Sequence, residues 1–216
     1  MRWLLLCTVL LVSCQKPKTV TPAEPSAPAP VVTKESPAVA TPTPPTPTSE
    51  PSGESLYQLD ITLTDQDGQK LSLKSFRGQP VIISMFYAHC PNACPMLIHK
   101  IQTIEDKLSD ADRKELRVLL VSFAPDADTN SVLKGLATKQ TVDEKRWRLT
   151  RTADASVREL ATVLGISYRK LDDGNYNHAS VLTLLDRGGQ PIAKLEGLAE
   201  PIDSFLQRVR SEAQKH

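Results

Sequence analysis

Two cysteines separated by three residues are the most chemically reactive feature of this 216-residue chain. They lie in Cys90-Pro91-Asn92-Ala93-Cys94, between an apolar run typical of a buried strand and a segment of helical periodicity. At a helix N-terminus, partial positive charge favours the thiolate of the first cysteine, and i, i+4 spacing brings both sulfurs to one side of the first turn. Two thiolates suit Cu(I). The same spacing, with Cα atoms about 6 Å apart, equally allows a structural disulfide.

His178 is the candidate third ligand because of its position in the chain. It follows the turn signal Asp172-Asp173-Gly174-Asn175 and immediately precedes a predicted strand, Ser180 to Asp186. A lone loop histidine is more often only solvated, but in a thioredoxin-like fold the loop before this strand lies against the cysteine loop. We therefore predict that Cys90, Cys94 and His178 bind one copper ion per chain, as Cu(I), Cu(II) or both. Structural zinc sites and iron–sulfur clusters take four protein ligands and are disfavoured.

Other side chains near the cysteines are weaker candidates. Met96 is expected to fill a gap in the core, which is the commoner role of methionine. Asp126 and Asp128 follow a predicted strand on the cysteine side of the sheet. We assign both to helix capping and solvation, with tuning of the metal site as the alternative. Three further histidines are expected to be solvated: His89, His99 and His216.

The elements that position these residues follow from apolar periodicity and turn signals. Alternation predicts a strand from Tyr57 to Thr64, and Asp67-Gly68 turns it into a second strand at Lys70. The predicted core elements, in chain order, are a buried strand 80–87, a helix from the cysteines to Leu108, a strand 117–123, a helix capped by Asp128 or Thr129, a strand 147–150, a helix 155–164 closed by Gly165, a hairpin 181–196 and a helix from Pro201 to near Arg210. This order predicts an α/β, thioredoxin-like fold with an N-terminal β-hairpin.

The N-terminus reads as a targeting segment outside the fold. A short basic start precedes the apolar run Leu4–Val12, which is too short to span a bilayer. Leu11-Val12-Ser13-Cys14 resembles a bacterial lipobox, which predicts lipidation of Cys14; an ordinary secretory signal with an incidental Cys14 is the alternative. We therefore expect an exported protein, lipid-anchored to a bacterial membrane on its extracytoplasmic (periplasmic) side. Cys90 and Cys94 are then the remaining thiols in an oxidising compartment, and we expect them to be a redox disulfide pair whose disulfide and copper-loaded states exclude each other.

Composition divides the chain into three parts. Residues 1–13 are assigned to a lipoprotein signal peptide, 14–53 to the lipidated cysteine and a Pro/Thr/Ala-rich disordered tether, and 54–216 to the thioredoxin-like copper-binding domain. The formal net charge of +1 and the aromatic content of 5% give no reason to expect nucleic acid as a partner.

The motif residues resemble those of the Sco (SenC) family of cytochrome oxidase copper chaperones. The resemblance rests on the run from Phe86 to Pro95, with Cys-x-x-x-Cys-Pro, and on Tyr176-Asn177-His178-Ala179-Ser180 before a strand. It implies a thioredoxin fold, copper bound by two cysteines and one histidine, and delivery of copper to the binuclear copper centre of cytochrome c oxidase. Asn92 and Ala124 stand where the family usually has Asp, but the three ligand positions are kept.

Two classes of function follow from these observations. The first is a metallochaperone, not an enzyme in the strict sense, with thiol–disulfide reductase activity as an additional capacity. Its partners would be the terminal oxidase subunit that carries the binuclear copper centre, and other copper chaperones or a thiol reductant. The alternative is an extracytoplasmic thiol–disulfide oxidoreductase of the thioredoxin or TlpA type. That class typically has two residues between its cysteines and a Pro before the strand that follows the active-site loop, whereas this chain has three and His178-Ala179-Ser180.

Overall fold

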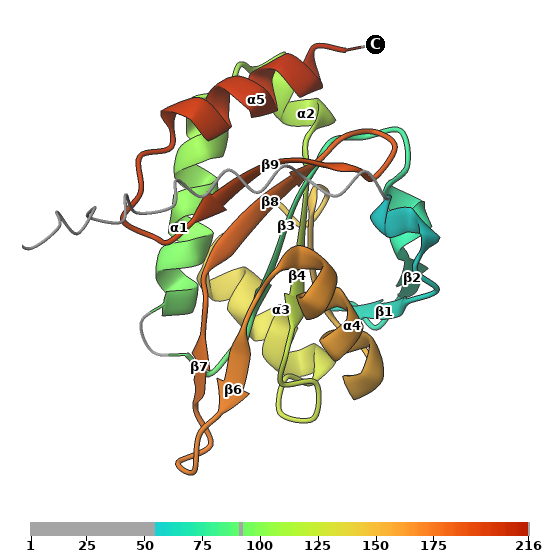
Figure 1. Ribbon diagram of the computed structural model, residues 1–216, viewed down its shortest axis with the longest axis vertical. Helices are drawn as coiled ribbons and strands as arrows, with labels where there is room; N and C mark the ends of the chain where they lie inside the picture. Colours follow the sequence, from blue (N-terminus) through green and yellow to red (C-terminus); the bar gives the residue numbers. More distant parts are fainter. Residues whose placement is uncertain (1–54, 91–92, 216) are drawn as a thin grey trace, which may run out of the picture. The chain divides into compact units, whose positions relative to one another are not determined.

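A computed structural model describes residues 55–90 and 93–215 of the chain. A seven-stranded mixed sheet forms its centre, in the order β2-β1-β5-β4-β3-β8-β9 (Figure 1). The three central strands β3, β4 and β5 are parallel, and the other four pair antiparallel. The strands are β1 (Thr62–Asp65), β2 (Lys70–Ser72), β3 (Val81–Phe86), β4 (Arg117–Ser122), β5 (Trp147–Arg151), β8 (Val181–Leu185) and β9 (Pro191–Glu196).

Helices cover both faces of this sheet. In Figure 1, α1, α2 and α5 gather on one side, while α3 and α4 lie on the other. The helices are α1 (Ala93–Asp106), α2 (Asp110–Glu115), α3 (Asn130–Lys139), α4 (Asp154–Leu164) and α5 (Asp203–Ala213), with short 3₁₀ helices η1 (Leu56–Gln58) and η2 (Leu73–Phe76). Among the described residues, none of these helices is long and apolar enough to cross a bilayer.

Most predicted elements are confirmed. Every residue of β3 is buried, as its continuous apolar run predicts for a central strand covered on both faces. Gly165 closes α4 in the left-handed conformation, with φ of 70°. The α/β, thioredoxin-like architecture with an N-terminal hairpin is therefore correct.

Two local assignments are wrong, and one helix has no counterpart among the predicted elements. The predicted strand from Tyr57 to Thr64 begins only at Thr62, because Ser55 accepts a hydrogen bond from the Tyr57 amide and starts η1 instead. The closing helix begins at Asp203 and continues past Arg210 to Ala213. Helix α2 was not predicted; Ser109 caps it by accepting from the Asp112 amide.

A separate two-stranded sheet carries His178. β6 (Tyr168–Lys170) pairs antiparallel with β7 (Tyr176–His178), and Tyr168 faces His178 in this register. The turn between the strands closes through a hydrogen bond of 2.7 Å from the Leu171 amide to the Asn175 carbonyl. This hairpin sets the position of His178 just before β8.

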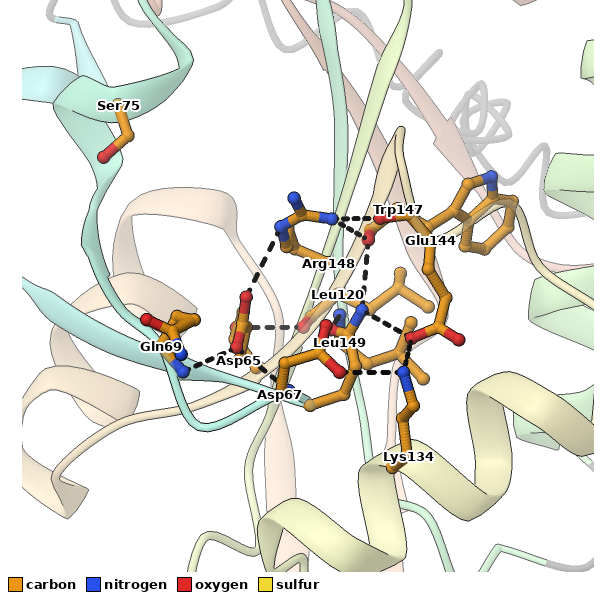
Figure 2. Close-up of polar contacts among 12 residues, drawn as sticks. Asp65, Asp67, Gln69, Ser75, Leu120, Lys134, Glu144, Trp147, Arg148 and Leu149 are labelled. Carbon is orange, nitrogen blue, oxygen red and sulfur yellow. Dashed lines mark hydrogen bonds and ion pairs between the residues drawn. The ribbon is translucent and has the colours of Figure 1, made fainter.

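A polar network fastens the N-terminal hairpin to the rest of the sheet (Figure 2). The Lys134 ammonium on α3 donates to Asp67 at 2.7 Å and to Glu144 at 2.6 Å, and Arg148 Nε lies 3.4 Å from Asp65 Oδ2. The ion pairs of Lys134 are exposed and contribute little stability; they connect α3 to the β1–β2 turn and to the segment before β5.

Several predictions fall outside the described residues. These are the signal peptide 1–13, the lipidation of Cys14, the tether 14–53, and the positions of Asn92 and His216. The domain boundaries therefore remain predictions.

Candidate metal centre

Folding brings together the three residues that the sequence singles out as ligands. One donor atom each from Cys90, Cys94 and His178 lie within 4.8 Å of one another. A metal with bonds of about 2.0–2.3 Å to three donors holds them roughly 3.5–4.5 Å apart, so this spacing fits a single ion. Two thiol sulfurs and one imidazole nitrogen form a set that suits copper.

The strand register explains this convergence. Cys90 follows the end of β3, and Cys94 lies in the first turn of α1. β3 and β8 are antiparallel neighbours, with Ile83 opposite Thr183. The residues after β3 therefore lie beside those before β8, and His178 is placed next to the cysteine loop.

The two thiols are buried and are not joined by a disulfide. Cys90 is 9% exposed and Cys94 is 1% exposed. Burial is the main cause that raises the pKa of the Cys94 thiol, and the neighbouring Cys90 and the carboxylate of Asp128 raise this pKa further. Binding of a metal at Cys94 must therefore displace a tightly held proton.

Aromatic rings enclose the imidazole of His178. The Phe123 ring centroid lies 4.9 Å from that of His178, and the Tyr87 ring meets it edge-on at 6.1 Å. Burial lowers the pKa of His178, while its contact with the Ala179 carbonyl opposes this effect. His178 Nδ1 lies 3.3 Å from that carbonyl oxygen, which can only accept. A hydrogen bond to this carbonyl requires the proton on Nδ1, and that tautomer leaves the Nε2 lone pair for a metal.

This aromatic enclosure was not predicted from the sequence. Tyr87 and Phe123 follow directly on β3 and β4, and Tyr168 and Tyr176 face the same cluster from β6 and β7. The available signal was an aromatic residue directly after each of two neighbouring parallel strands, because the carboxyl ends of parallel strands meet at one edge of the sheet.

The expectation for Asp128 was wrong. Its side chain is fully buried, and Oδ2 accepts from the Ala88 amide at 2.9 Å and from the Ser122 hydroxyl at 2.5 Å. Thr129, not Asp128, caps α3. Capping and solvation therefore do not describe Asp128, whereas the neighbouring Asp126 is exposed as expected.

Met96 does not fill a core gap either. It is 55% exposed, because two residues along a helix turn its side chain about 200° away from the buried Cys94. His99 is exposed on α1. His89 is not part of the ligand group; its side chain is 64% exposed, with Nδ1 at 3.5 Å from Asp128 Oδ1.

A cavity of about 380 Å³ borders the aromatic enclosure, and its lining does not include Cys90, Cys94 or His178. Tyr87 and Tyr176, two rings of the aromatic enclosure, line it together with His89. Ala124 also lines this cavity and contributes only a methyl group to the wall.

Known proteins match this chain over most of its length. A family model described as SCO1/SenC matches residues 49–214. The SCO1 protein homolog of Bacillus subtilis (strain 168) is 24% identical over 160 residues, which cover 72% of this chain and 82% of that protein.

Solved structures share the fold. A SCO1/SenC family lipoprotein from Bacillus anthracis matches with a TM-score of 0.67 and 19% identity, over 77% of this chain and 99% of that one. Arabidopsis thaliana ScoI with copper bound matches with a TM-score of 0.61 and 18% identity, over 72% of this chain and 97% of that one. BsSco matches with a TM-score of 0.63 and 21% identity, over 72% of this chain and 92% of that one. It is a member of the Sco family of cytochrome c oxidase assembly proteins, and a disulfide switch is described in it.

Proposed function

Because the chain belongs to the SCO1/SenC family, we propose that it binds one copper ion through Cys90, Cys94 and His178 and passes it to a client protein. One observation carries the proposal: donor atoms from two elements far apart in sequence converge within 4.8 Å. The relative from Arabidopsis thaliana has copper bound in its solved structure, which supports copper as the ion.

The arrangement suits a carrier better than a catalyst. Both thiols are buried, while His178 is only partly buried and lines a surface hollow of about 390 Å³ together with Tyr168 and Asn177. A client that approaches from this side meets the imidazole before it meets the sulfurs. Exchange of one ligand at a time lets copper move between proteins without release to water. We therefore assign the chain as a metallochaperone for which copper is the cargo.

We propose the binuclear copper centre of cytochrome c oxidase as the destination. The family includes BsSco, a cytochrome c oxidase assembly protein, and membership of the same family supports cytochrome c oxidase as the client. Pull-down of the oxidase subunit that carries this centre, with copper-loaded and metal-free protein, tests the assignment. Equal capture of an unrelated copper protein would argue against it.

We also propose that a lipid on Cys14 holds the protein at the extracytoplasmic side of a bacterial membrane. The lipobox-like Leu11-Val12-Ser13-Cys14 supports this location, as does the lipoprotein relative from Bacillus anthracis. Detergent partitioning of the wild-type protein and of Cys14→Ser tests it. Release of the wild-type protein into the aqueous phase would refute the anchor.

The copper proposal is tested by metal content after anaerobic reduction and loading with Cu(I). We expect one copper per chain in the wild-type protein and none retained through gel filtration by the Cys90→Ser/Cys94→Ser variant. His99→Ala is the matched control, because His99 is an exposed histidine on the same helix as Cys94. Full copper retention by the double cysteine variant would overturn the proposal.

A further inference from the structure

Asp128 is a fully buried carboxylate that does not belong to the ligand group. Removal of a carboxylate from water is costly unless hydrogen bonds or an opposite charge compensate. Among the described residues, the one basic side chain within ion-pair distance of Asp128 is that of His89, at 3.5 Å. In the part of the chain that the structure describes, no lysine or arginine forms an ion pair with this carboxylate.

The hydrogen bonds of Asp128 join two loops that border the metal centre. Oδ2 accepts from the amide of Ala88, two residues before Cys90, and from the Ser122 hydroxyl at the end of β4. Ser122 Oγ in turn accepts from the Ala124 amide at 2.9 Å. Asp128 thereby fixes the backbone that leads into Cys90 against the β4–α3 loop.

The second carboxylate oxygen is buried and has no hydrogen-bond partner. It is directed toward the side chain of His89, the residue directly before Cys90. A structural anchor needs only the oxygen that accepts from Ala88 and Ser122. The other oxygen keeps a poorly compensated negative charge close to the cysteine loop.

We propose that Asp128 is a positioning residue of the copper site, which holds the Cys90 loop in place and whose negative charge favours bound Cu(II) over Cu(I). The inference rests on the proposed copper function. Two thiolates give a complex of net charge −1 with Cu(I) and 0 with Cu(II). A nearby carboxylate repels the more negative complex, so it weakens Cu(I) binding relative to Cu(II) binding.

The charge is tested with Asp128→Asn. The amide oxygen still accepts from Ala88 and Ser122, so the variant removes the charge and keeps the anchor. We expect the ratio of Cu(II) affinity to Cu(I) affinity to fall on the order of tenfold, with a shifted thiolate-to-Cu(II) absorption band. Asp126→Asn is the matched control, because it removes an exposed carboxylate from the same loop. An unchanged ratio in Asp128→Asn, or an equal fall in Asp126→Asn, would overturn the charge effect.

The anchor is tested in metal-free protein by hydrogen exchange. In Asp128→Ala we expect the Ala88 amide to exchange at least about tenfold faster, whereas Asp128→Asn should leave it within about threefold of wild type. Unchanged exchange in Asp128→Ala would overturn the anchoring role. If Asp128→Ala does not fold, Ser122→Ala is measured in its place: it removes the second donor to Asp128 Oδ2, and we expect the less constrained carboxylate to let the Ala88 amide exchange faster than in wild type. A wild-type protein that binds no copper defeats the proposed function, while the exchange result still decides the anchor.

Discussion

At the scale of single residues, the three predicted ligands differ in the copper oxidation state that they serve. Thiolates are soft and suit Cu(I), whereas the imidazole of His178 is the harder donor that Cu(II) prefers. Burial lowers the pKa of His178, so the neutral, metal-binding form of the imidazole predominates at neutral pH. The ligand set therefore separates into a thiol pair for Cu(I) and an imidazole for Cu(II).

We predict that His178→Ala loses Cu(II) more completely than Cu(I). Loss of an outer partner of a ligand already costs about 10–100-fold in metal affinity, so loss of the ligand itself should cost at least about 100-fold for Cu(II). Cu(I) affinity should fall by less than about tenfold, because Cys90 and Cys94 remain. Competition titrations with chromogenic chelators in each oxidation state measure both values. Unchanged Cu(II) affinity would remove His178 from the site.

Residue patterns predicted the ligand group but not its supporting contacts. The sequence alone shows both the residue types and the positions next to predicted strands that single out Cys90, Cys94 and His178. The burial of Asp128 depends on a hydrogen bond to Ala88, 40 positions away. No local pattern carries that information, and an aspartate before a helix is usually a cap.

At the scale of elements, continuous or periodic segments were predictable and the short irregular ones were not. β3 is apolar throughout, and its burial at every position follows from that composition. The segment around Tyr57 also alternates, but Ser55 caps a 3₁₀ turn there and both Leu56 and Tyr57 are buried. Consecutive buried residues reflect a tertiary contact, since the Leu56 amide donates to the Gly189 carbonyl in the β8–β9 turn.

This contact makes Tyr57 a suitable residue to test. Its ring packs so closely on Gly189, where φ is 83°, that a Cβ there would overlap ring atoms. Its hydroxyl is buried without a hydrogen-bond partner. Burial, aided by the charge of Asp186, raises the pKa of Tyr57 to about 12.

We predict that Tyr57→Phe is neutral or stabilises the fold by up to about 1 kcal/mol at pH 7. The raised pKa means that the folded state keeps the phenol proton after the unfolded state has lost it. Ionisation of Tyr57 in the unfolded state therefore lowers the free energy of unfolding at alkaline pH. The contribution of the protonated phenol is fully present below pH 10 and is lost as the pH rises toward about 12. Denaturant melts at pH 7, 10 and 11.5 should show a smaller alkaline loss in the variant. An equal loss in both proteins would contradict the assignment.

At the scale of the whole molecule, copper loading and disulfide formation should exclude each other. Oxidation of Cys90 and Cys94 joins the two sulfurs and releases two protons and two electrons to an oxidant such as diamide. The disulfide leaves no thiolate for Cu(I), so reduction must precede loading. The sulfurs already lie within 4.8 Å of each other, so oxidation needs only a small movement.

We predict that Cu(I) raises the melting temperature only of the reduced protein. Thermal melts of oxidised, reduced and reduced copper-loaded protein measure this difference. Ligand binding at about 100 times Kd adds at most about 2.7 kcal/mol to the free energy of unfolding, and Cu(I) adds less than this because the two thiols of the unfolded chain also bind it. The structural-disulfide alternative predicts instead that the oxidised form is the more stable form and that copper adds nothing after reduction. Equal increases in the melting temperatures of the oxidised and reduced proteins would contradict this mutual exclusion of copper and disulfide.

The positions of the three ligands along the chain make the binding of Cu(I) and the binding of Cu(II) depend on folding to different extents. Cys90 and Cys94 are neighbours in sequence, so an unfolded chain still presents them as a dithiol chelator, while His178 reaches them only through the assembled sheet. A ligand stabilises the native state only to the extent that it prefers that state to the unfolded ensemble. Cu(I) held by thiols alone binds both and discriminates weakly between them. Cu(II) binding depends on the imidazole, so Cu(II) binds the folded state in preference to the unfolded chain. A newly made chain would thus capture Cu(I) before its fold is complete, whereas occupancy by Cu(II) is a property of the finished molecule.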